Sequence, residues 1–420
     1  MPKHTNLKNL VKHPAQESQE GEVSARAGDI FDKAFGFTRA DEAVRAGIYP
    51  YFKPIAEQHG GTVKVDGREM IITGSNDYLG LTQDPRLERA AVSVFDNYGT
   101  SCTGSRYLTG TLALHEELER RLAGFFEAEA ALTFSTGFLG MLAVLSSLTG
   151  RQDILYLDRE NHASLYDGAR LSFGTMRKYR HNDLEDLERL LDRDSGKPGG
   201  RMIVTDGVFS MSGHIADLPG IIELARKYDA RVAVDDAHAT GVLGENGRGT
   251  PEHFGLEVDI IIGTFSKSFA SVGGFMTGPR SVINYVKHHG RPFIFTAALP
   301  AMQVAVALGA LNIMEAEPQH RERLHQNATQ LRQGLRALGF DTLGSETQIV
   351  PVLIGPDELT VIFWKGLWEA GIFTTPALPP GVPPGQSIIR TSVNANHTPE
   401  QIERLLEAFA AVGRTLGVIA

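Results

Sequence analysis

The stretch VDIIIGTFSKSFAS, residues 258–271, joins a nearly continuous apolar run to a polar end. The run of valine and isoleucine is typical of a strand that is buried on both faces, as in a parallel sheet covered by helices. Thr264, Ser266 and Lys267 follow at once. Because ligands bind at the carboxyl ends of strands in such sheets, these three residues are expected at a binding site.

Similar apolar runs occur upstream, and helical patterns separate them. The runs are AALTF (130–134), DILYL (153–157), RMIVTD (201–206) and RVAVDD (231–236), and two of the helical patterns are LEDLERLLDR (184–193) and LPGIIELARKY (218–228). Apolar strands that alternate with helices predict an α/β fold with a large, mostly parallel sheet that helices cover on both faces.

The two ends of the chain follow other patterns. Alternating residues on both sides of Asp66-Gly67 predict a hairpin over 62–73. A short helix is expected within 40–52, ending before Pro50. Beyond Pro300, two long helices (about 301–316 and 319–338) precede strands and a last helix from Thr398. We therefore expect an N-terminal arm, helix and hairpin over 1–75, a large domain over 76–300 and a smaller C-terminal α+β domain over 301–420.

Composition limits the partners and the compartment. The 420-residue chain has a net charge of −9, which argues against nucleic acid as a partner. Cys102 is the only cysteine, so no internal disulfide forms, and a cytoplasmic location is expected. A small buried filler is a better interpretation of this cysteine than a nucleophile. Residues 1–28 are polar and are expected to form a loosely ordered arm without a targeting signal.

Two uncharged stretches, 130–150 and 292–314, are long enough to span a bilayer if each is helical. STG interrupts the first and TAALP the second. Each is therefore expected to be a strand or loop followed by a buried helix, and at most peripheral membrane contact is expected.

Polar groups gather where the predicted strands end. The turn STGF places Gly137 and Phe138 at the start of a helix, where free backbone N–H groups suit a phosphate. His162 follows the second strand, and Asp235 and His238 follow the fourth. Because these residues and Thr264, Ser266 and Lys267 all follow strand ends, a single ligand that contacts all of them is expected.

Pyridoxal 5'-phosphate is such a ligand. Its aldehyde needs the Lys267 amine, and its phosphate needs the N–H groups and the hydroxyls. Asp235 beside the pyridine nitrogen would keep that nitrogen protonated. His162 offers a flat surface for the ring, and His238 offers a donor to its phenolic oxygen. No metal site is expected.

These motifs resemble those of the α-oxoamine synthases over residues 40–416. They are FSTGF, DRENHASLYDGARLS, VDDAHATGVLGENGRG, GTFSKSFASVGGF and RPFIFTAALP. The family comprises fold-type I, pyridoxal-phosphate-dependent enzymes that condense an amino acid with an acyl thioester and release CO2. Within it, the bacterial soluble serine palmitoyltransferases are the most similar.

The resemblance implies a role for each matching residue. Lys267 would be the Schiff-base lysine and the base that removes the α-proton, and His162 would stack on the ring. The catalytic set is Lys267, His162, Asp235 and His238, and the cofactor-binding set is Gly137, Phe138, His162, Ser210, Asp235, His238, Thr264, Ser266, Lys267 and Thr296.

The same resemblance explains the place of Thr296 in this set and assigns two further residues. Thr296 matches a threonine that reaches the phosphate from a neighbouring subunit, which implies a homodimer with shared sites. Asn76 and Arg390 match residues that hold the amino-acid carboxylate, a task that suits a guanidinium fork. The loop DGVFSMSGH, 206–214, departs from the family because Ser212 and His214 replace acidic or apolar residues, so its contacts stay open.

The implied reaction condenses L-serine with palmitoyl-CoA and gives 3-oxosphinganine, CoA and CO2. An alternative is another member of the family that uses alanine or glycine, such as an 8-amino-7-oxononanoate synthase or a 2-amino-3-ketobutyrate CoA ligase. A pyridoxal-phosphate aminotransferase and a non-catalytic partner subunit are the alternatives outside the family. Joint retention of Lys267, Asp235 and His162 argues against the partner subunit.

Overall fold

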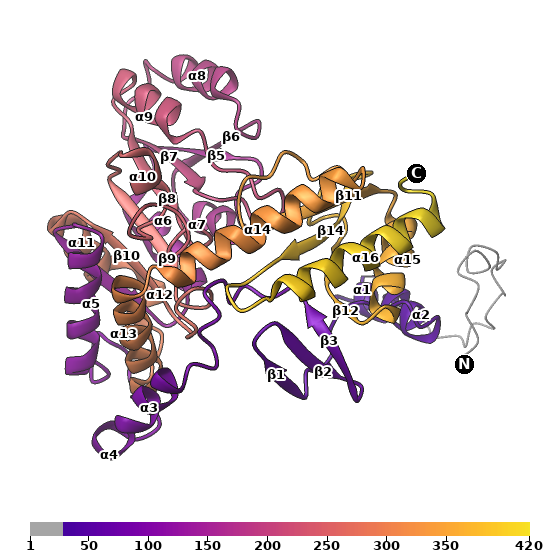
Figure 1. The fold of residues 1–420 in the computed structure, drawn as a ribbon. Helices are drawn as coiled ribbons and strands as arrows, with labels where there is room; N and C mark the ends of the chain where they lie inside the picture. The colour runs from indigo at the N-terminus through magenta and orange to yellow at the C-terminus, as the bar shows by residue number, and fades with distance from the viewer. Residues whose placement is uncertain (1–27) are drawn as a thin grey trace.

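A seven-stranded sheet forms the centre of the computed structural model, which describes residues 28–420 (Figure 1). Every neighbouring pair is parallel except the two that involve β10, which runs antiparallel to β4 and β9. The predicted large and mostly parallel sheet is therefore confirmed. In spatial order the strands are β4 (Ala130–Phe134), β10 (Gly274–Gly278), β9 (Ile260–Thr264), β8 (Arg231–Asp235), β7 (Arg201–Asp206), β5 (Ile154–Asp158) and β6 (Thr175–Tyr179).

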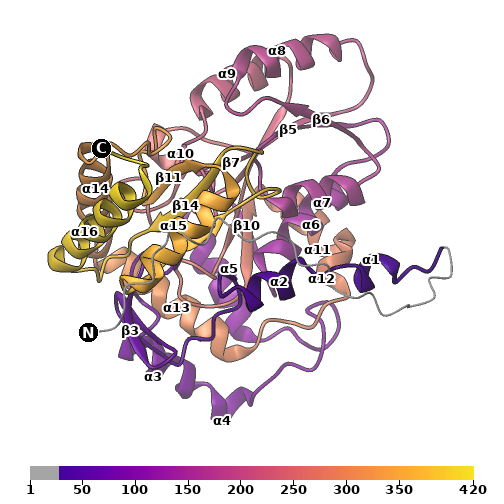
Figure 2. The same ribbon diagram turned by 90° about the vertical axis from the view of Figure 1, so that its right-hand side faces the viewer.

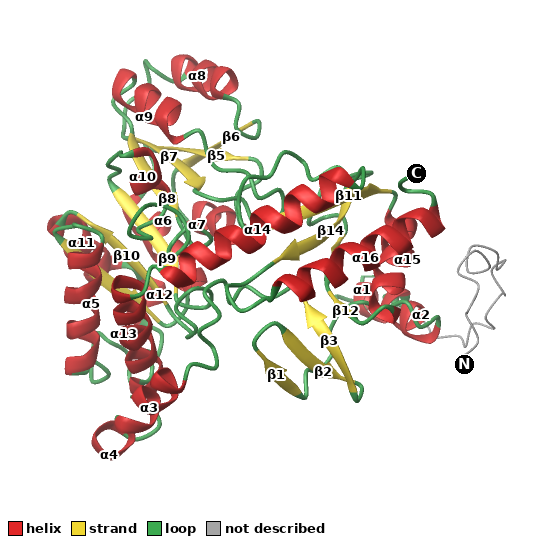
Figure 3. Ribbon diagram, viewed as in Figure 1, coloured by secondary structure: helices red, strands yellow, loops and turns green. Residues whose placement is uncertain are grey.

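Helices cover both faces of this sheet (Figure 3). The packing of alternate residues of β5 shows which helices lie on which face. Leu155 and Leu157 pack with side chains of α6 (Gly137–Leu148) and α7 (Ala163–Leu171). Ile154 and Tyr156 pack with side chains of α8 (Leu184–Arg193) and α9 (Leu218–Lys227). Because neighbouring residues of a strand point to opposite faces, the two helix pairs lie on opposite sides. The remaining helices of this region are α3 (Pro85–Ser93), α4 (Phe95–Tyr98), α5 (Ala113–Phe125), α10 (Thr250–Phe254), α11 (Arg280–His289) and α12 (Arg291–Ile294).

The N-terminal part contains the predicted hairpin. It is formed by β2 (Thr62–Val65) and β3 (Arg68–Ile72), with Asp66 and Gly67 at φ angles of 51° and 74° in the turn. The helix expected within 40–52 is shorter, because α2 (Arg39–Arg45) ends before Gly47. The arm expected over 1–28 lies outside the described residues except for Gly28. The other elements here are α1 (Asp32–Phe35) and β1 (Glu57–His59).

The C-terminal part is built on a three-stranded sheet in the order β11-β14-β13, apart from a four-stranded sheet in the order β1-β2-β3-β12. Two long helices, α14 (Gln319–Ala337) and α16 (Pro399–Leu416), pack side by side (Figures 1 and 2). The preceding helix α13 (Ala301–Ala316) instead packs against α3 and α5. The domain bounds at 75 and 300 stay a prediction. The other elements are β11 (Ile349–Gly355), α15 (Asp357–Glu369), β12 (Ile372–Phe373), β13 (Thr375–Ala377) and β14 (Ser387–Ser392).

The two uncharged stretches are divided between elements. Residues 130–150 form β4, a turn and α6, and residues 292–314 include most of α12, a loop and most of α13. Among residues 28–420, no helix combines the length and the apolar character needed to cross a bilayer.

Candidate active site

The carboxyl ends of β7, β8 and β9 meet the start of α6 around a cavity of about 280 Å³. All eight residues predicted from the strand ends line it. They are Gly137, Phe138, His162, Asp235, His238, Thr264, Ser266 and Lys267. The structure thus brings these side chains to one cavity, and their roles stay a prediction.

The start of α6 forms an anion cradle. The Thr136 hydroxyl accepts a hydrogen bond from the Leu139 N–H at 3.1 Å and caps the helix. The N–H groups of Gly137 and Phe138, the first two residues of the helix, have no partner within it and can bind an anion. A Cβ at Gly137 would lie 2.8 Å from the Cβ of Thr264, so only glycine allows this close approach. Thr264 and Ser266 add hydroxyl oxygens that lie 2.9 Å apart.

Lys267 brings an amine without a partner to the same cavity. Within residues 28–420, this amine makes no hydrogen bond or ion pair. Burial lowers the pKa of Lys267 from 10.5 to about 8, although Asp235 and Asp206 act in the opposite direction. A lysine in this state is neutral often enough near neutral pH to react with an aldehyde.

Two carboxylates lie on adjacent strands beside the lysine. Asp206 of β7 and Asp235 of β8 are paired in register, and both are buried. Burial raises the pKa of Asp235, and the charge of Lys267 acts against that rise. The pKa of Asp206 is raised well above its ordinary value by burial and by Asp235. The sequence predicted Asp206 as the last residue of a strand and assigned it no role, whereas the structure makes it part of the cavity wall.

Both predicted histidines are held by hydroxyl groups. Nδ1 of His162 lies 2.7 Å from the hydroxyl of Ser164, and its ring is exposed to the cavity. Nδ1 of His238 lies 2.6 Å from the hydroxyl of Tyr78. Burial lowers the pKa of His162, and it lowers the pKa of His238 well below 6.5. Burial therefore favours the neutral form of both rings.

The predicted carboxylate-binding pair is also assembled. Nη2 of Arg390 donates to Oδ1 of Asn76 at 3.1 Å, and Nε of Arg390 donates to the backbone oxygen of Ser210 at 2.7 Å. Ser210 does not line the cavity that contains Lys267. It lines a larger neighbouring cavity of about 1110 Å³, which shares His162 with the first.

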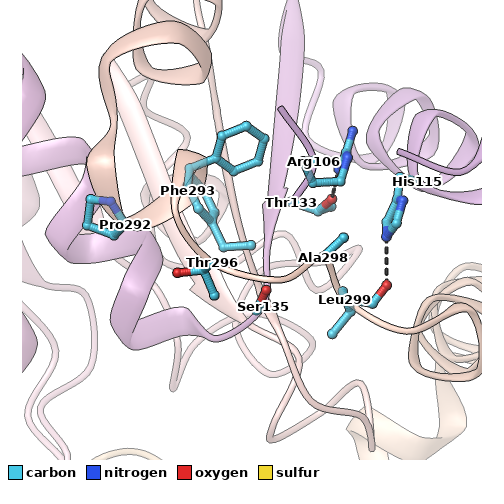
Figure 4. A pocket seen from close by; sticks show the side chains of 10 residues that line it. Arg106, His115, Thr133, Ser135, Pro292, Phe293, Thr296, Ala298 and Leu299 are labelled. Atoms are coloured by element: carbon cyan, nitrogen blue, oxygen red, sulfur yellow. Dashed lines mark hydrogen bonds between the residues drawn. The ribbon is translucent and has the colours of Figure 1, made fainter. Parts of the chain in front are cut away.

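Thr296 lies apart from the other predicted cofactor residues. It follows α12 and lines a small separate cavity with Ser135, Arg106 and His115 (Figure 4). Within its own chain, Thr296 therefore does not line the cavity that contains Lys267.

Sequence reasoning missed the side chains that orient the histidines. Tyr78 lies in the turn after Asn76, in the stretch GSNDYLGL, which carries no periodic signal. Ser164 follows His162 by two residues, and its backbone N–H donates to Nδ1 of His162, the residue that caps α7. The spacing of Ser164 could have identified it, whereas Tyr78 reaches His238 across 160 residues of sequence.

The residues of this cavity fit pyridoxal phosphate. The unpartnered amine of Lys267, the glycine cradle and the buried Asp235 match the aldehyde, the phosphate and the pyridine nitrogen in turn.

Comparisons with known proteins agree with this fit. Residues 68–409 match the family Aminotransferase class I and II. The chain is 43% identical to a serine palmitoyltransferase from Bacteriovorax stolpii, with 95% of this chain and 97% of that protein covered. It is also 43% identical to an 8-amino-7-oxononanoate synthase from Thermoanaerobacter pseudethanolicus, with 93% and 99% covered. A solved structure of serine palmitoyltransferase from S. paucimobilis with bound PLP and myriocin superposes with a TM-score of 0.89 at 36% identity, with 93% and 98% covered.

The chain therefore belongs to the aminotransferase class I and II family and has the fold-type I architecture. Within that class its relatives are α-oxoamine synthases, and it is a pyridoxal-phosphate-dependent enzyme of that group. The predicted family, fold class and cofactor are confirmed.

Proposed function

We propose that this protein condenses L-serine with a long-chain acyl thioester, palmitoyl-CoA, and releases 3-oxosphinganine, CoA and CO2. The observation that carries the proposal is the pairing of two cavities. The inner cavity contains Lys267 and the two carboxylates, and it joins at His162 an outer cavity of about 1110 Å³. Ordinary small-molecule pockets measure roughly 300–1,000 Å³, so the outer cavity has room for a long acyl chain.

The outer cavity has the lining that an acyl thioester needs. Its apolar wall comes from Phe209, Met211, Ile388 and the proline-rich loop 379–384. Its charged residues include Arg159 and Arg180. An apolar wall with basic groups suits an acyl chain attached to a phosphate-bearing carrier.

The inner residues would hold the cofactor and the amino acid. Pyridoxal phosphate, when bound, supplies an electron sink for the amino-acid α-carbon. Gly137, Phe138, Thr264 and Ser266 would bind its phosphate. Arg390 and Asn76 would bind the serine carboxylate, and His162 would lie against the ring.

Three side chains would control protons in this reaction. Lys267 would take the α-proton, because its lowered pKa makes the neutral amine accessible. Asp235 would hold the proton on the pyridine nitrogen. Tyr78, whose pKa burial raises, would donate to Nδ1 of His238 and leave Nε2–H as a donor to the phenolic oxygen.

We also infer that the enzyme is a homodimer in which Thr296 serves the partner's phosphate. Thr296 lies outside the Lys267 cavity of its own chain, beside apolar side chains that one chain leaves exposed. Leu108 is 78% exposed and Phe295 is 73% exposed. A second subunit would cover these side chains and bring Thr296 to a cradle.

Product mass spectrometry tests the reaction. Holoenzyme is incubated with L-serine, L-alanine or glycine and with palmitoyl, dicarboxylic or short acyl thioesters, carried by CoA or by an acyl carrier protein. The expected main product is 3-oxosphinganine from serine and palmitoyl-CoA. A preference for alanine with a dicarboxylic thioester would instead indicate an 8-amino-7-oxononanoate synthase, the function of a relative of equal identity. Loss of the amine to an added keto acid would indicate an aminotransferase.

A further inference from the structure

Two histidines connect the large sheet to the C-terminal part beside the outer cavity. Nδ1 of His181 lies 3.1 Å from Oδ1 of the buried Asp158, and Nε2 of His181 lies 2.8 Å from Nδ1 of His214. Nε2 of His214 lies 2.5 Å from the backbone oxygen of Leu343. The result is a continuous chain of contacts from the end of β5 to the loop between α14 and β11.

The number of protons in this chain follows from its geometry. The contacts to Asp158 and to Leu343 each need an N–H, because both partners are acceptors. The contact between the two imidazoles needs one N–H and one lone pair. Three of the four ring nitrogens must therefore carry hydrogen, whereas two neutral imidazoles carry only two. The pair is complete only when it binds one extra proton.

The charged groups around the pair favour that proton. Asp158 faces His181 from β5, and Oε2 of Glu160 lies 3.6 Å from Nε2 of His181. Burial lowers the pKa of His181, but the two carboxylates outweigh it and leave this pKa above 6.5. The neighbouring charges of the adjoining turns are Arg180, which pairs with Asp183, and Asp341, which accepts a hydrogen bond from the Leu343 N–H.

The pair also bears on the arginine that is proposed to bind the substrate. His214 closes the loop that follows β7, because its backbone oxygen accepts a hydrogen bond from the Phe209 N–H at 2.9 Å. The same loop contains Ser210, whose backbone oxygen accepts from Nε of Arg390 at 2.7 Å. Displacement of His214 would therefore move one of the two groups that orient Arg390.

We infer that His181 and His214 share one bound proton and act together as a pH-dependent strut that positions Arg390 through Ser210. The inference rests on the proposed function only in taking Arg390 as the ligand of the serine carboxylate. When the shared proton is lost, one contact of the chain becomes a repulsion between lone pairs. The contact to Asp158 is the one that stays, because a carboxylate holds the N–H of His181 more strongly than a neutral acceptor would. Either the contact between the two rings or the contact to Leu343 then opens, and both outcomes break the link from β5 to the C-terminal part.

This strut explains the departure of the loop from the α-oxoamine synthase pattern. An acidic side chain at position 214 could accept a hydrogen bond from His181. It could not donate to the carbonyl of Leu343, so the link to the C-terminal part would be missing. Histidine at 214 supplies that link, and it makes the link depend on pH.

The test measures the dissociation constant of L-serine for the holoenzyme between about pH 6 and pH 9, from the absorbance change of the cofactor. The wild-type constant should rise about 5- to 10-fold as the pair loses its proton, the effect of one lost hydrogen bond on a positioned ligand. His214→Asp should bind serine about 5- to 10-fold more weakly at low pH, without this titration step. His181→Asn should behave in the same way, and it covers the possibility that the first variant folds poorly. The exposed His253, changed to Gln, is the matched control and should keep the wild-type profile.

Hydrogen–deuterium exchange of residues 207–217 gives a readout that does not require turnover. After correction for intrinsic rates, exchange should increase above the pH at which serine affinity falls, and His214→Asp should show the faster exchange at every pH. An unchanged pH profile of serine binding in His214→Asp, or pH-independent exchange in the wild type, would overturn the inference. Failure to form product from any thioester, with these pH effects intact, would refute only the proposed function.

Discussion

The reactivity of Lys267 can be tested through its pKa. Burial lowers this pKa from 10.5 to about 8. At about pH 7.5, roughly a quarter of an amine with a pKa of 8 is neutral, against roughly one part in a thousand for an ordinary lysine. The amine should therefore react with an aldehyde a few hundred times faster than an exposed lysine of equal nucleophilicity.

The assay is the rate at which pyridoxal phosphate loads onto enzyme from which it has been removed, followed by absorbance. Since the neutral amine is the reactive form, the rate should rise with pH and level off above about pH 8. Lys267→Ala supplies the background from other lysines. Asp235→Asn removes the carboxylate that raises the pKa of Lys267, so the half-maximal rate should shift to a lower pH.

A rate that keeps increasing to about pH 10 would show that burial does not lower the pKa of this amine. A shift to higher pH in Asp235→Asn would contradict the assigned direction of the electrostatic effect. Either outcome would refute the account of Lys267 as a lysine activated by its surroundings, even if the enzyme proved active.

Two further predictions concern the substrate carboxylate and the second subunit. Arg390→Lys keeps the charge but loses the guanidinium fork that donates to Asn76 and to Ser210. The KM for serine should therefore rise about 10- to 100-fold, with a smaller change in kcat. An unchanged KM would show that Arg390 does not bind serine. Mixed dimers of one Lys267→Ala subunit and one Thr296→Ala subunit should regain about half of the wild-type activity, because one of the two shared sites contains both wild-type residues. Activity at the level of the separate variants would show that Thr296 acts within its own chain.

Most of the sheet was predictable because its strands are apolar on both faces. The runs that became β4, β5, β7, β8 and β9 stand out for that reason. Strand β10 was not predicted, because its sequence GFMTG contains two glycines, which weaken any strand signal. Gly274 is needed there, since a Cβ would lie 2.5 Å from the Cα of Gly137 in the cradle. The close packing that builds the phosphate site thus removes the pattern that would reveal the strand.

The edge strand β6 was missed for a different reason. Its sequence TMRKY places polar and charged side chains on a half-exposed edge, where neither a continuous apolar run nor a clear alternation develops. The turn after β6 carries His181, so this omission also hid one member of the histidine pair. The contact of His181 with His214 spans 33 residues of sequence, and the contact of His214 with Leu343 spans 129.

Some features of the site can likewise be predicted from nearby sequence, whereas others depend on residues that are distant in the sequence. A residue at the end of a parallel strand can be assigned to the site from its own neighbours in sequence, as Asp235 and Lys267 were. The neighbours of a strand end cannot be predicted in this way, because strand order is a property of the whole sheet. The register of β7 with β8 sets Asp206 opposite Asp235, and burial of both carboxylates raises the pKa of each. Two buried acids so placed resist full ionisation unless a cation lies near them, and Lys267 is that cation when it is protonated. The charge states of these three groups are therefore coupled, and a change at Asp206 should alter Lys267 although no local pattern connects them.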